Sequence, residues 1–194
     1  MMFRLIGHSI DKSARIHPIL LWKCKKIVVE EKVNIGPLTV FRELNRLHLG
    51  KGAKVGQLNW ISASAMLSKL GAPSELVMQQ ETVITNRHYL DVSGGVRIES
   101  FSAITGVRST LMTHGVSYAT NQQSWKEIVI GHHNLIGSNS IIVPGVKTPP
   151  HSIYGMGSLI AGQSSDEYQL YLNSPSKVAK TLDMDNRYFK KSNG

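Results

Sequence analysis

The chain has 194 residues, of which 41% are hydrophobic and 18% charged, and its 22 Lys and Arg outnumber 13 Asp and Glu to give a formal net charge of +9. This length and composition predict one folded domain and exclude a disordered chain. The longest apolar run near the start, residues 19–22, stops at Lys23, so neither a membrane-spanning helix nor a secretory signal is expected. The single cysteine, Cys24, excludes an internal disulfide and a multi-cysteine metal site. We therefore expect a soluble, cytoplasmic protein.

The positive charge lies mainly at the two ends of the chain. Residues 1–32 carry seven Lys and Arg against three acids, residues 177–194 carry five against two, and the middle is almost neutral. A nucleic-acid-binding domain usually carries a basic stripe with interleaved aromatics across its folded face, which this middle lacks. We expect no nucleic-acid partner, because basic ends are better suited to the phosphates of a small ligand, an anionic polymer or a membrane surface.

Residues 1–26 precede the regular part of the sequence and are interpreted as an N-terminal extension. Residues 11–24 predict a short helix, which Pro18 disfavours in its interior. The apolar residues 19–22, followed by lysines, would allow a weak peripheral contact with an anionic membrane. The alternative is that they pack in the core or in a trimer.

From residue 27 to residue 163, aliphatic residues recur every six positions, usually followed by a small residue. The runs are Leu49-Gly50, Val55-Gly56 and Ile61; Ile84, Leu90, Ile98 and Ile104, with a two-residue slip between Leu90 and Ile98; and Ile130-Gly131, Ile136-Gly137 and Ile142. A helix would place positions i and i+6 about 240° apart, and a single strand would need apolar partners at i+2 and i+4. A step of six fits a chain that turns a corner after each short strand, so that three steps complete a triangular coil and the aliphatics point into a stacked column. The sequence therefore predicts a mainly β, parallel β-helix.

Two stretches interrupt this six-residue repeat, which we call the beat: residues 62–76 and residues 115–127. Long loops inside a compact domain are uncommon and often functional, so we expect both to project from corners of the prism. After residue 163 the beat ends. There Ser165-Asp166-Glu167 predicts a helix cap with an acidic first turn. Residues 164–194 are accordingly expected to form a basic tail with a short helix.

Several motifs follow the beat in a fixed order. They are Thr113-His114-Gly115, Ile136-Gly137-Ser138-Asn139, Val143-Pro144-Gly145-Val146, Gly155-Met156-Gly157-Ser158 and Ser174-Pro175-Ser176-Lys177-Val178. This order resembles the left-handed β-helix, hexapeptide-repeat acyltransferases that use acetyl-CoA, especially their sugar and polysaccharide O-acetyltransferases. The resemblance spans roughly residues 27–182. It implies a left-handed coil, a homotrimer, no required metal, and transfer of an acetyl group from acetyl-CoA to a hydroxyl of a sugar or polysaccharide precursor.

His114 is the expected catalytic residue. The thiol of a thioester has a pKa of about 8.5 and leaves readily, whereas an alcohol hardly ionises near pH 7, so the acceptor hydroxyl needs a base such as histidine. His114 comes just before the second interruption, and the resemblance places the catalytic histidine in this Thr-His pair. The residues alone also allow a second interpretation, in which His114 only caps the turn beside Gly115.

Four residues are expected to contact the acceptor. His88 lies about one and a half coils before His114, close enough along the stack to face the same groove. The resemblance implies acceptor-binding roles for Asn86 and Asp91, and the alternative for Asp91 is a corner residue that hydrogen-bonds its own backbone. Trp125 would stack on a sugar or on the adenine ring, or else anchor its loop on the prism.

The resemblance also implies a donor site. It places the pantetheine of acetyl-CoA beside Ser138, Met156, Ala161 and Gly162, and the nucleotide phosphates near Lys177 and Lys180. Met156 and Gly162 stand where relatives often carry Ala and a Lys, and the alternative for the two lysines is a solvated basic helix. The adjacent pair His132 and His133 is expected at outward, solvated positions of a repeat.

Two other classes of function stay open. The same fold transfers acyl groups to amines of nucleotide sugars or small molecules, which acceptor screening would separate from O-acetylation. The other class is a metal-dependent carbonic anhydrase or a non-catalytic trimer on the same scaffold. The metal-dependent version needs three imidazoles that converge across a subunit boundary, and its usual His pair separated by four residues is missing around His114.

Overall fold

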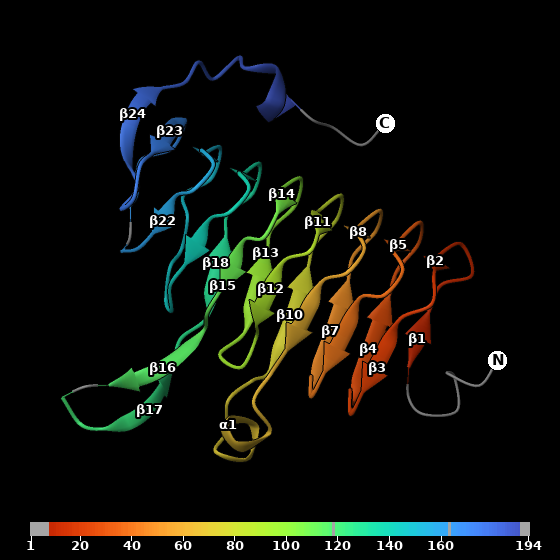
Figure 1. The fold of residues 1–194 in the computed structure, drawn as a ribbon. Coiled ribbons are helices and arrows are strands. Elements are labelled where there is room, and N and C mark those ends of the chain that lie inside the picture. The colour runs from red at the N-terminus through yellow and green to blue at the C-terminus, as the bar shows by residue number, and fades with distance from the viewer. Residues whose placement is uncertain (1–7, 118, 163, 191–194) are drawn as a thin grey trace.

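The computed structural model describes residues 8–117, 119–162 and 164–190. Each turn of the chain contributes one short strand to each of three sheets, so that the turns form stacked triangular coils. Figure 1 shows these coils stacked along one axis, from the N-terminal coil in red to the C-terminal strands in blue. The mainly β, parallel β-helix predicted from the six-residue step is confirmed.

The three sheets are the three faces of this prism. The first face contains β1 (Ser9–Ile10), β4 (Lys26–Val29), β7 (Arg46–Leu49), β10 (Glu75–Met78), β13 (Val96–Ile98) and β18 (Ile128–Ile130). The second face contains β2 (Arg15–Ile16), β5 (Asn34–Ile35), β8 (Lys54–Val55), β11 (Val83–Asn86), β14 (Ala103–Val107), β19 (Leu135–Ile136), β21 (Ile153–Tyr154), β23 (Gln169–Leu172) and β24 (Lys177–Thr181). The third face contains β3 (Leu20–Trp22), β6 (Val40–Arg42), β9 (Trp60–Ser62), β12 (Tyr89–Asp91), β15 (Thr110–Leu111), β20 (Ile141–Ile142) and β22 (Leu159–Ile160). Neighbouring strands of the faces pair in parallel, except that β24 runs antiparallel to β23.

The aliphatic residues of the beat form the core. All of them are at most 2% exposed: Leu49, Val55, Ile61, Ile84, Leu90, Ile98, Ile104, Ile130, Ile136 and Ile142. On the third face the register pairs Ile61 with Leu90, Leu90 with Leu111, and Leu111 with Ile142. One continuous column of inward side chains therefore runs along that face, as the sequence predicted.

The glycines of the beat allow the coils to approach each other. A Cβ added at Gly50 would lie 2.8 Å from the carbonyl carbon of Gln79 in the next coil, and one at Gly137 would lie 2.7 Å from the backbone nitrogen of Met156. A side chain at either position would push two backbones apart. The spacing of the coils, in addition to the bend at the corner, therefore requires a residue without a Cβ at these positions.

Both interruptions project from the corner between the third and first faces, which we call the third–first corner. The first contains α1 (Ala65–Lys69), and the second forms an antiparallel hairpin of β16 (His114–Ser117) and β17 (Gln122–Trp125). Figure 1 shows the helix and the hairpin extending from the same side of the prism. The turn from β12 to β13 lies between them in the stack, so this corner is flanked by a projecting segment on each side.

The prediction of a short helix after residue 163 is wrong. The chain forms β23 and β24 there, and the one helical turn in the described part of this segment is the 3-10 helix η2 (Arg187–Lys190). The cause is the open edge of the second face, where β23 pairs with β21 and Tyr171 stacks on Tyr154 with 4.6 Å between ring centroids. A strand at this edge satisfies backbone groups of β21 that a helix would leave unpaired.

The helix expected over residues 11–24 is also wrong, because β2 and β3 lie there and belong to the first coil. The parallel coils therefore begin before residue 27, and the apolar residues 19–22 contribute to β3. None of the helices in the described ranges is long and apolar enough to cross a membrane.

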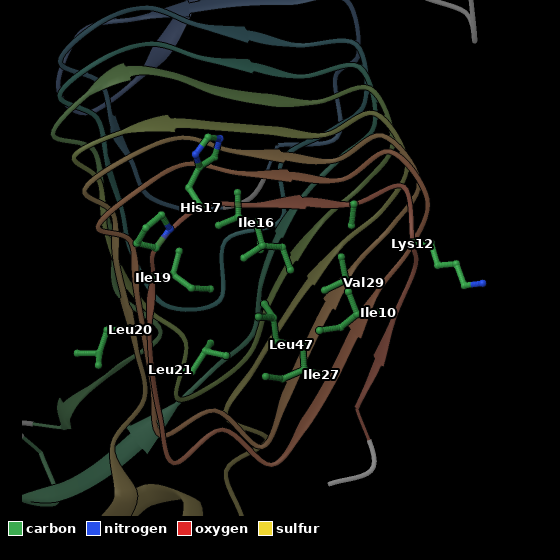
Figure 2. Close-up of a pocket in the computed structure, with 13 residues that line it drawn as sticks. Ile10, Lys12, Ile16, His17, Ile19, Leu20, Leu21, Ile27, Val29 and Leu47 are labelled. Atoms are coloured by element: carbon green, nitrogen blue, oxygen red, sulfur yellow. The ribbon is translucent and has the colours of Figure 1, made fainter. Parts of the chain in front are cut away.

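A cavity of about 1010 Å³ lies at the N-terminal mouth of the prism. Figure 2 shows Ile10, Leu21 and Ile27 pointing into the mouth of the coil, whereas Lys12 points away from it. Neither projecting segment contributes to its lining. We interpret this cavity as the end of the core column, separate from the candidate site at the third–first corner.

Candidate active site

His114 lies where the hairpin leaves the prism. It is the first residue of β16, shortly after β15 ends at Leu111 on the third face. Because the chain departs from the repeat at this point, the imidazole is not enclosed in the core, and its side chain is 27% exposed. The structure thus places His114 at a corner beside a projecting segment, where the sequence predicted it.

A buried carboxylate holds the imidazole. Asp91 ends β12, which pairs with β15 through Leu90 and Leu111, so Asp91 lies one coil before His114 at the same corner. Its Oδ2 lies 2.7 Å from Nδ1 of His114. The Asp91 side chain is 5% exposed. The two residues form a His–Asp dyad that joins consecutive coils.

Four further hydrogen bonds fix the Asp91 carboxylate. Oδ2 accepts from the backbone nitrogen (2.9 Å) and Oγ1 (2.6 Å) of Thr113, and Oδ1 accepts from the backbone nitrogen (3.2 Å) and Oγ (2.6 Å) of Ser93. Burial acts to raise the pKa of Asp91, but the hydrogen bonds from Ser93, Thr113 and His114 outweigh it and hold that pKa below its ordinary value. The carboxylate therefore stays ionised at neutral pH.

The ionised carboxylate decides which nitrogen of His114 carries the proton. Because Asp91 has no hydrogen to donate, the hydrogen between the two side chains belongs to Nδ1 of His114. In the neutral ring the free lone pair is then on Nε2. A histidine oriented in this way can accept a proton from a bound hydroxyl or amine.

Trp125 lies on the same side of the hairpin as His114. The two residues are directly opposite each other in the ladder of β16 and β17, and the side chains of such a pair lie on one face with Cβ atoms about 4.5–5.5 Å apart. Val116, two residues along the same face, is 59% exposed. An apolar surface that includes an indole therefore adjoins the imidazole.

His88 does not share this site. It precedes β12 at the opposite end of that strand from Asp91, at the second–third corner, and it is 2% exposed. Its Nδ1 accepts from the backbone nitrogen of Ser109 at 3.0 Å, and its Nε2 lies 3.0 Å from Oγ1 of Thr85. Burial lowers the pKa of His88 to about 4, so the ring is neutral. The prediction that His88 faces the groove of His114 is wrong, because the corner turns this ring into the prism.

Asn86 also lies at the second–third corner, where β11 ends. Its Oδ1 accepts from the backbone nitrogen of Gln57 in the preceding coil at 2.9 Å. The side chain thereby ties two coils together and lines a shallow groove on the second face. Of the two residues to which the resemblance gave acceptor-binding roles, the structure brings Asp91 to His114 and leaves Asn86 at the other corner.

The residues expected to bind pantetheine lie along both edges of the third face. Ser138 and Met156 are at the second–third corner, and Met156 is 79% exposed. Ala161 and Gly162 follow β22 at the third–first corner, two coils beyond His114 on the same edge, and both are exposed. One copy of the chain therefore divides the expected donor site between two edges.

Lys177 and Lys180 lie on β24 and are both exposed. The solvated basic helix considered as their alternative is wrong, since the segment is a strand paired antiparallel with β23. Both lysines remain available to an anionic ligand at the C-terminal end of the prism.

Two residues that support the dyad, Ser93 and Thr113, were missed from the sequence. The repeat could have identified them. Leu90 and Leu111 occupy equivalent positions in consecutive coils, so the residues that follow them must meet at one corner. Asp91 and Ser93 also have the two-residue spacing in which an aspartate bonds its own turn. The expected corner hydrogen bonds of Asp91 are thus present together with its bond to His114.

No protein-family model matches the chain, and no curated protein matches it either. The chain is similar to AntD, an N-acyltransferase from Bacillus cereus, in complex with dTDP and 3-hydroxybutyryl-CoA, with a TM-score of 0.63 at 15% identity over 94% of this chain and 87% of that one. It is also similar to the polysialic acid O-acetyltransferase OatWY, with a TM-score of 0.62 at 15% identity over 94% and 92% of the two chains. A hexapeptide-repeat-containing acetyltransferase from Vibrio cholerae, VCA0836, gives a TM-score of 0.57 at 18% identity over 70% and 74%.

These likenesses show that the chain has the fold of the hexapeptide-repeat acyltransferases. Its structural neighbours include both an O-acetyltransferase and an N-acyltransferase. The fold alone therefore leaves the acceptor atom, oxygen or nitrogen, to be argued from the site.

Proposed function

We propose that the protein is an acetyl-CoA-dependent acetyltransferase that moves an acetyl group to a hydroxyl of a sugar or polysaccharide precursor, with His114 as the general base. The observation that carries this proposal is the dyad: Asp91 holds Nδ1 of His114 at 2.7 Å, and Nε2 is left for a substrate at a corner between two projecting segments. The fold shared with acyltransferases supports the reaction class.

The dyad supplies what transfer to an alcohol lacks in water. Acetyl-CoA provides the acetyl group as a thioester, whose thiol leaves readily at a pKa of about 8.5. Nε2 of His114 accepts the hydroxyl proton as the acceptor oxygen attacks the acetyl carbon; the C–O bond forms, the C–S bond breaks, and the imidazolium returns the proton to the departing sulfur. Asp91 stabilises the transient imidazolium and fixes its orientation. No covalent enzyme intermediate is required.

The role of Asp91 in this proposal is to position His114. Its oxygens already accept five hydrogen bonds from Ser93, Thr113 and His114 and are almost fully buried, which disfavours direct contact with the acceptor. Trp125 is the residue we propose to contact the acceptor, since it faces the same side of the hairpin as the imidazole.

Transfer to an amine is the second candidate. The same dyad can accept a proton from an amino group, and the structurally similar AntD is an N-acyltransferase. Pairs of acceptor sugars that differ only in a hydroxyl or an amino group at one carbon separate the two reactions. Faster turnover of the amino member in every pair would replace O-acetylation with N-acylation.

We further propose a homotrimer with the donor site between neighbouring prisms. The outward side chains of the third face form an apolar row whose members lie in register, and four of them are 43–51% exposed: Leu20, Trp60, Tyr89 and Ile141. A symmetric assembly would cover this row. It would also bring the two edges of the third face, from different copies, to one groove.

In that arrangement the proposed donor residues come together. They are Ser138, Met156, Ala161 and Gly162 for the pantetheine, and Lys177 and Lys180 for the phosphates. Asn86 would reach the acceptor from a neighbouring copy. Light scattering on the wild type should give the mass of three chains, and Trp60→Glu should give a lower mass. A monomeric wild type would contradict the assembly.

Three further features stay predictions that follow from the sequence and the resemblance. They are the left-handed sense of the coil, a cytoplasmic location, and a weak contact of the first coil with anionic membranes. Binding to anionic liposomes that is lost in Trp22→Ser would support the membrane contact, since Trp22 is exposed on β3.

His114→Ala tests the proposed function. Release of CoA from acetyl-CoA is measured with a panel of sugars and glycans, and the variant should turn over about 10²–10⁴-fold more slowly while it still binds CoA. The matched control is His48→Ala, because His48 Nε2 lies 2.7 Å from Oε1 of Glu30 in a similar pair on the first face. Full activity in His114→Ala, or an equal loss in His48→Ala, would contradict the assignment.

A further inference from the structure

A second group of histidines lies at a different corner of the prism. His132 and His133 follow β18 at the first–second corner, and His151 precedes β21 at the same corner one coil later. The backbone nitrogen of His151 donates to the carbonyl oxygen of His132 at 3.0 Å. The expectation that His132 and His133 are solvated is wrong, because all three residues are partly buried where the two coils meet. We call these residues the three-histidine cluster.

The three imidazoles converge. Each offers one ring nitrogen that lies within 4.8 Å of the other two. Nδ1 of His132 is 3.1 Å from Nδ1 of His133. A carboxylate lies beside one of them, because Oε2 of Glu167 is 3.4 Å from Nδ1 of His151. Two coils thus contribute three imidazoles to one cluster, and the segment before β23 places a carboxylate beside His151.

Nδ1 of His151 is the unusual atom of this group. It is buried, and its contact with the Glu167 oxygen at 3.4 Å is too long for a well-formed hydrogen bond. A buried polar atom without a hydrogen bond normally costs stability, so such atoms in native proteins call for an explanation. A ligand that accepts the lone pair of this nitrogen would remove that cost.

Aromatic rings enclose the three-histidine cluster along the stack of coils. Phe101 stacks on His133 with 4.9 Å between ring centroids, and Tyr168 stacks on His151 at 4.6 Å with 6° between planes. Phe189 meets His151 edge-on at 5.5 Å. These rings restrict the imidazole orientations and limit the access of water, as the surroundings of bound metal ions commonly do.

The donors lie close enough together to share a tetrahedral metal ion. Zinc binds imidazole nitrogen and carboxylate oxygen at about 2.0–2.2 Å, which places neighbouring ligands of a tetrahedron about 3.3–3.5 Å apart. The His132–His133 and His151–Glu167 separations of 3.1 Å and 3.4 Å are close to this value, and the ring nitrogens of the three histidines, which lie within 4.8 Å of one another, would draw together around an ion. Three imidazoles and one carboxylate form a set of four protein ligands, which is typical of a structural site.

We propose that His132, His133, His151 and Glu167 bind one divalent transition-metal ion, with the properties of a structural Zn²⁺ site. The ion connects the sixth coil, the seventh coil and the C-terminal segment that carries β23 and β24. It lies at the first–second corner, whereas the dyad lies at the third–first corner, so it takes no part in acyl transfer. The site is also formed within one chain, unlike the subunit-spanning site of a carbonic anhydrase on this scaffold.

Metal titration of the chelator-treated, full-length protein tests this proposal. One equivalent of Co²⁺ should give the visible absorption of a tetrahedral site, and Zn²⁺ should displace it with a Kd tighter than about 1 µM. Zn²⁺ should also raise the melting temperature, because it binds only the folded state. His151→Ala should weaken Zn²⁺ binding by about 100-fold or more, and Glu167→Gln by about 10-fold.

Two control variants exclude other histidines. His48→Ala and His114→Ala remove the imidazoles of two other close His–carboxylate pairs, and both should bind Zn²⁺ as the wild type does. If His151→Ala fails to fold, His132→Asn and Glu167→Gln decide the outcome. Wild-type binding weaker than about 100 µM, or binding of the same strength in the His132, His151 and Glu167 variants, would overturn the proposal. Transfer activity is not the readout, so failure here leaves the proposed function untouched.

Discussion

His88 and His114 lie at opposite ends of the third face in consecutive coils, and they differ in the groups that surround them. His88 is fully buried among neutral partners, Thr85 and Ser109, and its pKa is lowered to about 4. His114 remains partly exposed, and the buried group beside it is a carboxylate. At the third–first corner the fold buries the anion and leaves the imidazole that we propose as the base accessible. Burial of an imidazole among neutral groups lowers its pKa instead, as at His88.

The largest expected effect comes from removing the charge of Asp91. Asp91→Asn should lower kcat by about 10²–10⁴-fold, because the amide neither stabilises an imidazolium nor fixes its tautomer. The KM for acetyl-CoA should change little, which separates a positioning role from general damage to the fold. Steady-state kinetics with the acceptor found in the screen measures both constants.

Asp11→Asn is the matched control for this substitution. Oδ1 of Asp11 accepts from the backbone nitrogen and Oγ of Ser13, as Asp91 does from Ser93, but Asp11 lies in the first coil, far along the stack from His114. It should retain wild-type kcat. A similar loss in both variants would show that Asp91 acts through the turn alone.

The next effect is on the free energy of unfolding, and it tests whether His88 is neutral and buried as the comparison with His114 requires. Its pKa is about 4 in the folded protein and about 6.5 when unfolded, so the unfolded state binds more protons between these values and stability falls as pH decreases from 6.5 to 4. His88→Gln retains a donor and an acceptor but cannot titrate. In urea unfolding at pH 7, 5.5 and 4.5, the wild type should lose up to about 1.4 kcal/mol more per pH unit than the variant. Parallel losses in the two proteins would contradict the neutral, buried assignment.

The smallest effect is expected at Trp125. Trp125→Ala should raise the KM for the acceptor by about 3–10-fold, because a stacked ring contributes about 0.5–1.5 kcal/mol beyond its buried area, while kcat stays within a few-fold. Trp22→Ala, which changes an exposed tryptophan of the first coil, should leave this KM unchanged. A Trp125 variant with wild-type KM and a lowered melting temperature would assign the indole to anchoring the hairpin.

The core and the location of His114 were predictable because they depend on local spacing. Leu90 and Ile142 follow from the step of six, and on the third face both pair with Leu111, which lies seven residues after Ile104. The position of His114 beside a projecting segment follows from the same beat. These features need no knowledge of which coils touch.

The predictions that were wrong concern features that depend on contacts between coils or at the ends of the stack. Ser165-Asp166-Glu167 carries a local helix cap, yet the open edge of β21 offered paired hydrogen bonds that a helix would forgo. His151 is 18 residues from His133, and only the stacking of two coils brings their rings within 5.1 Å. A step of six gives the period, but it does not say which way a corner residue points.

The hairpin starts with His114, the residue whose side chain Asp91 holds in place. His114 is tied to the prism through Asp91, whereas the outer residues beyond Ser117 have no part in that bond. If the proposed function holds, insertions or deletions in the outer part of the hairpin would change the surface beside the substrate while the imidazole stays in place. Substrate selectivity and proton transfer would then be separable targets for engineering, joined at a single residue.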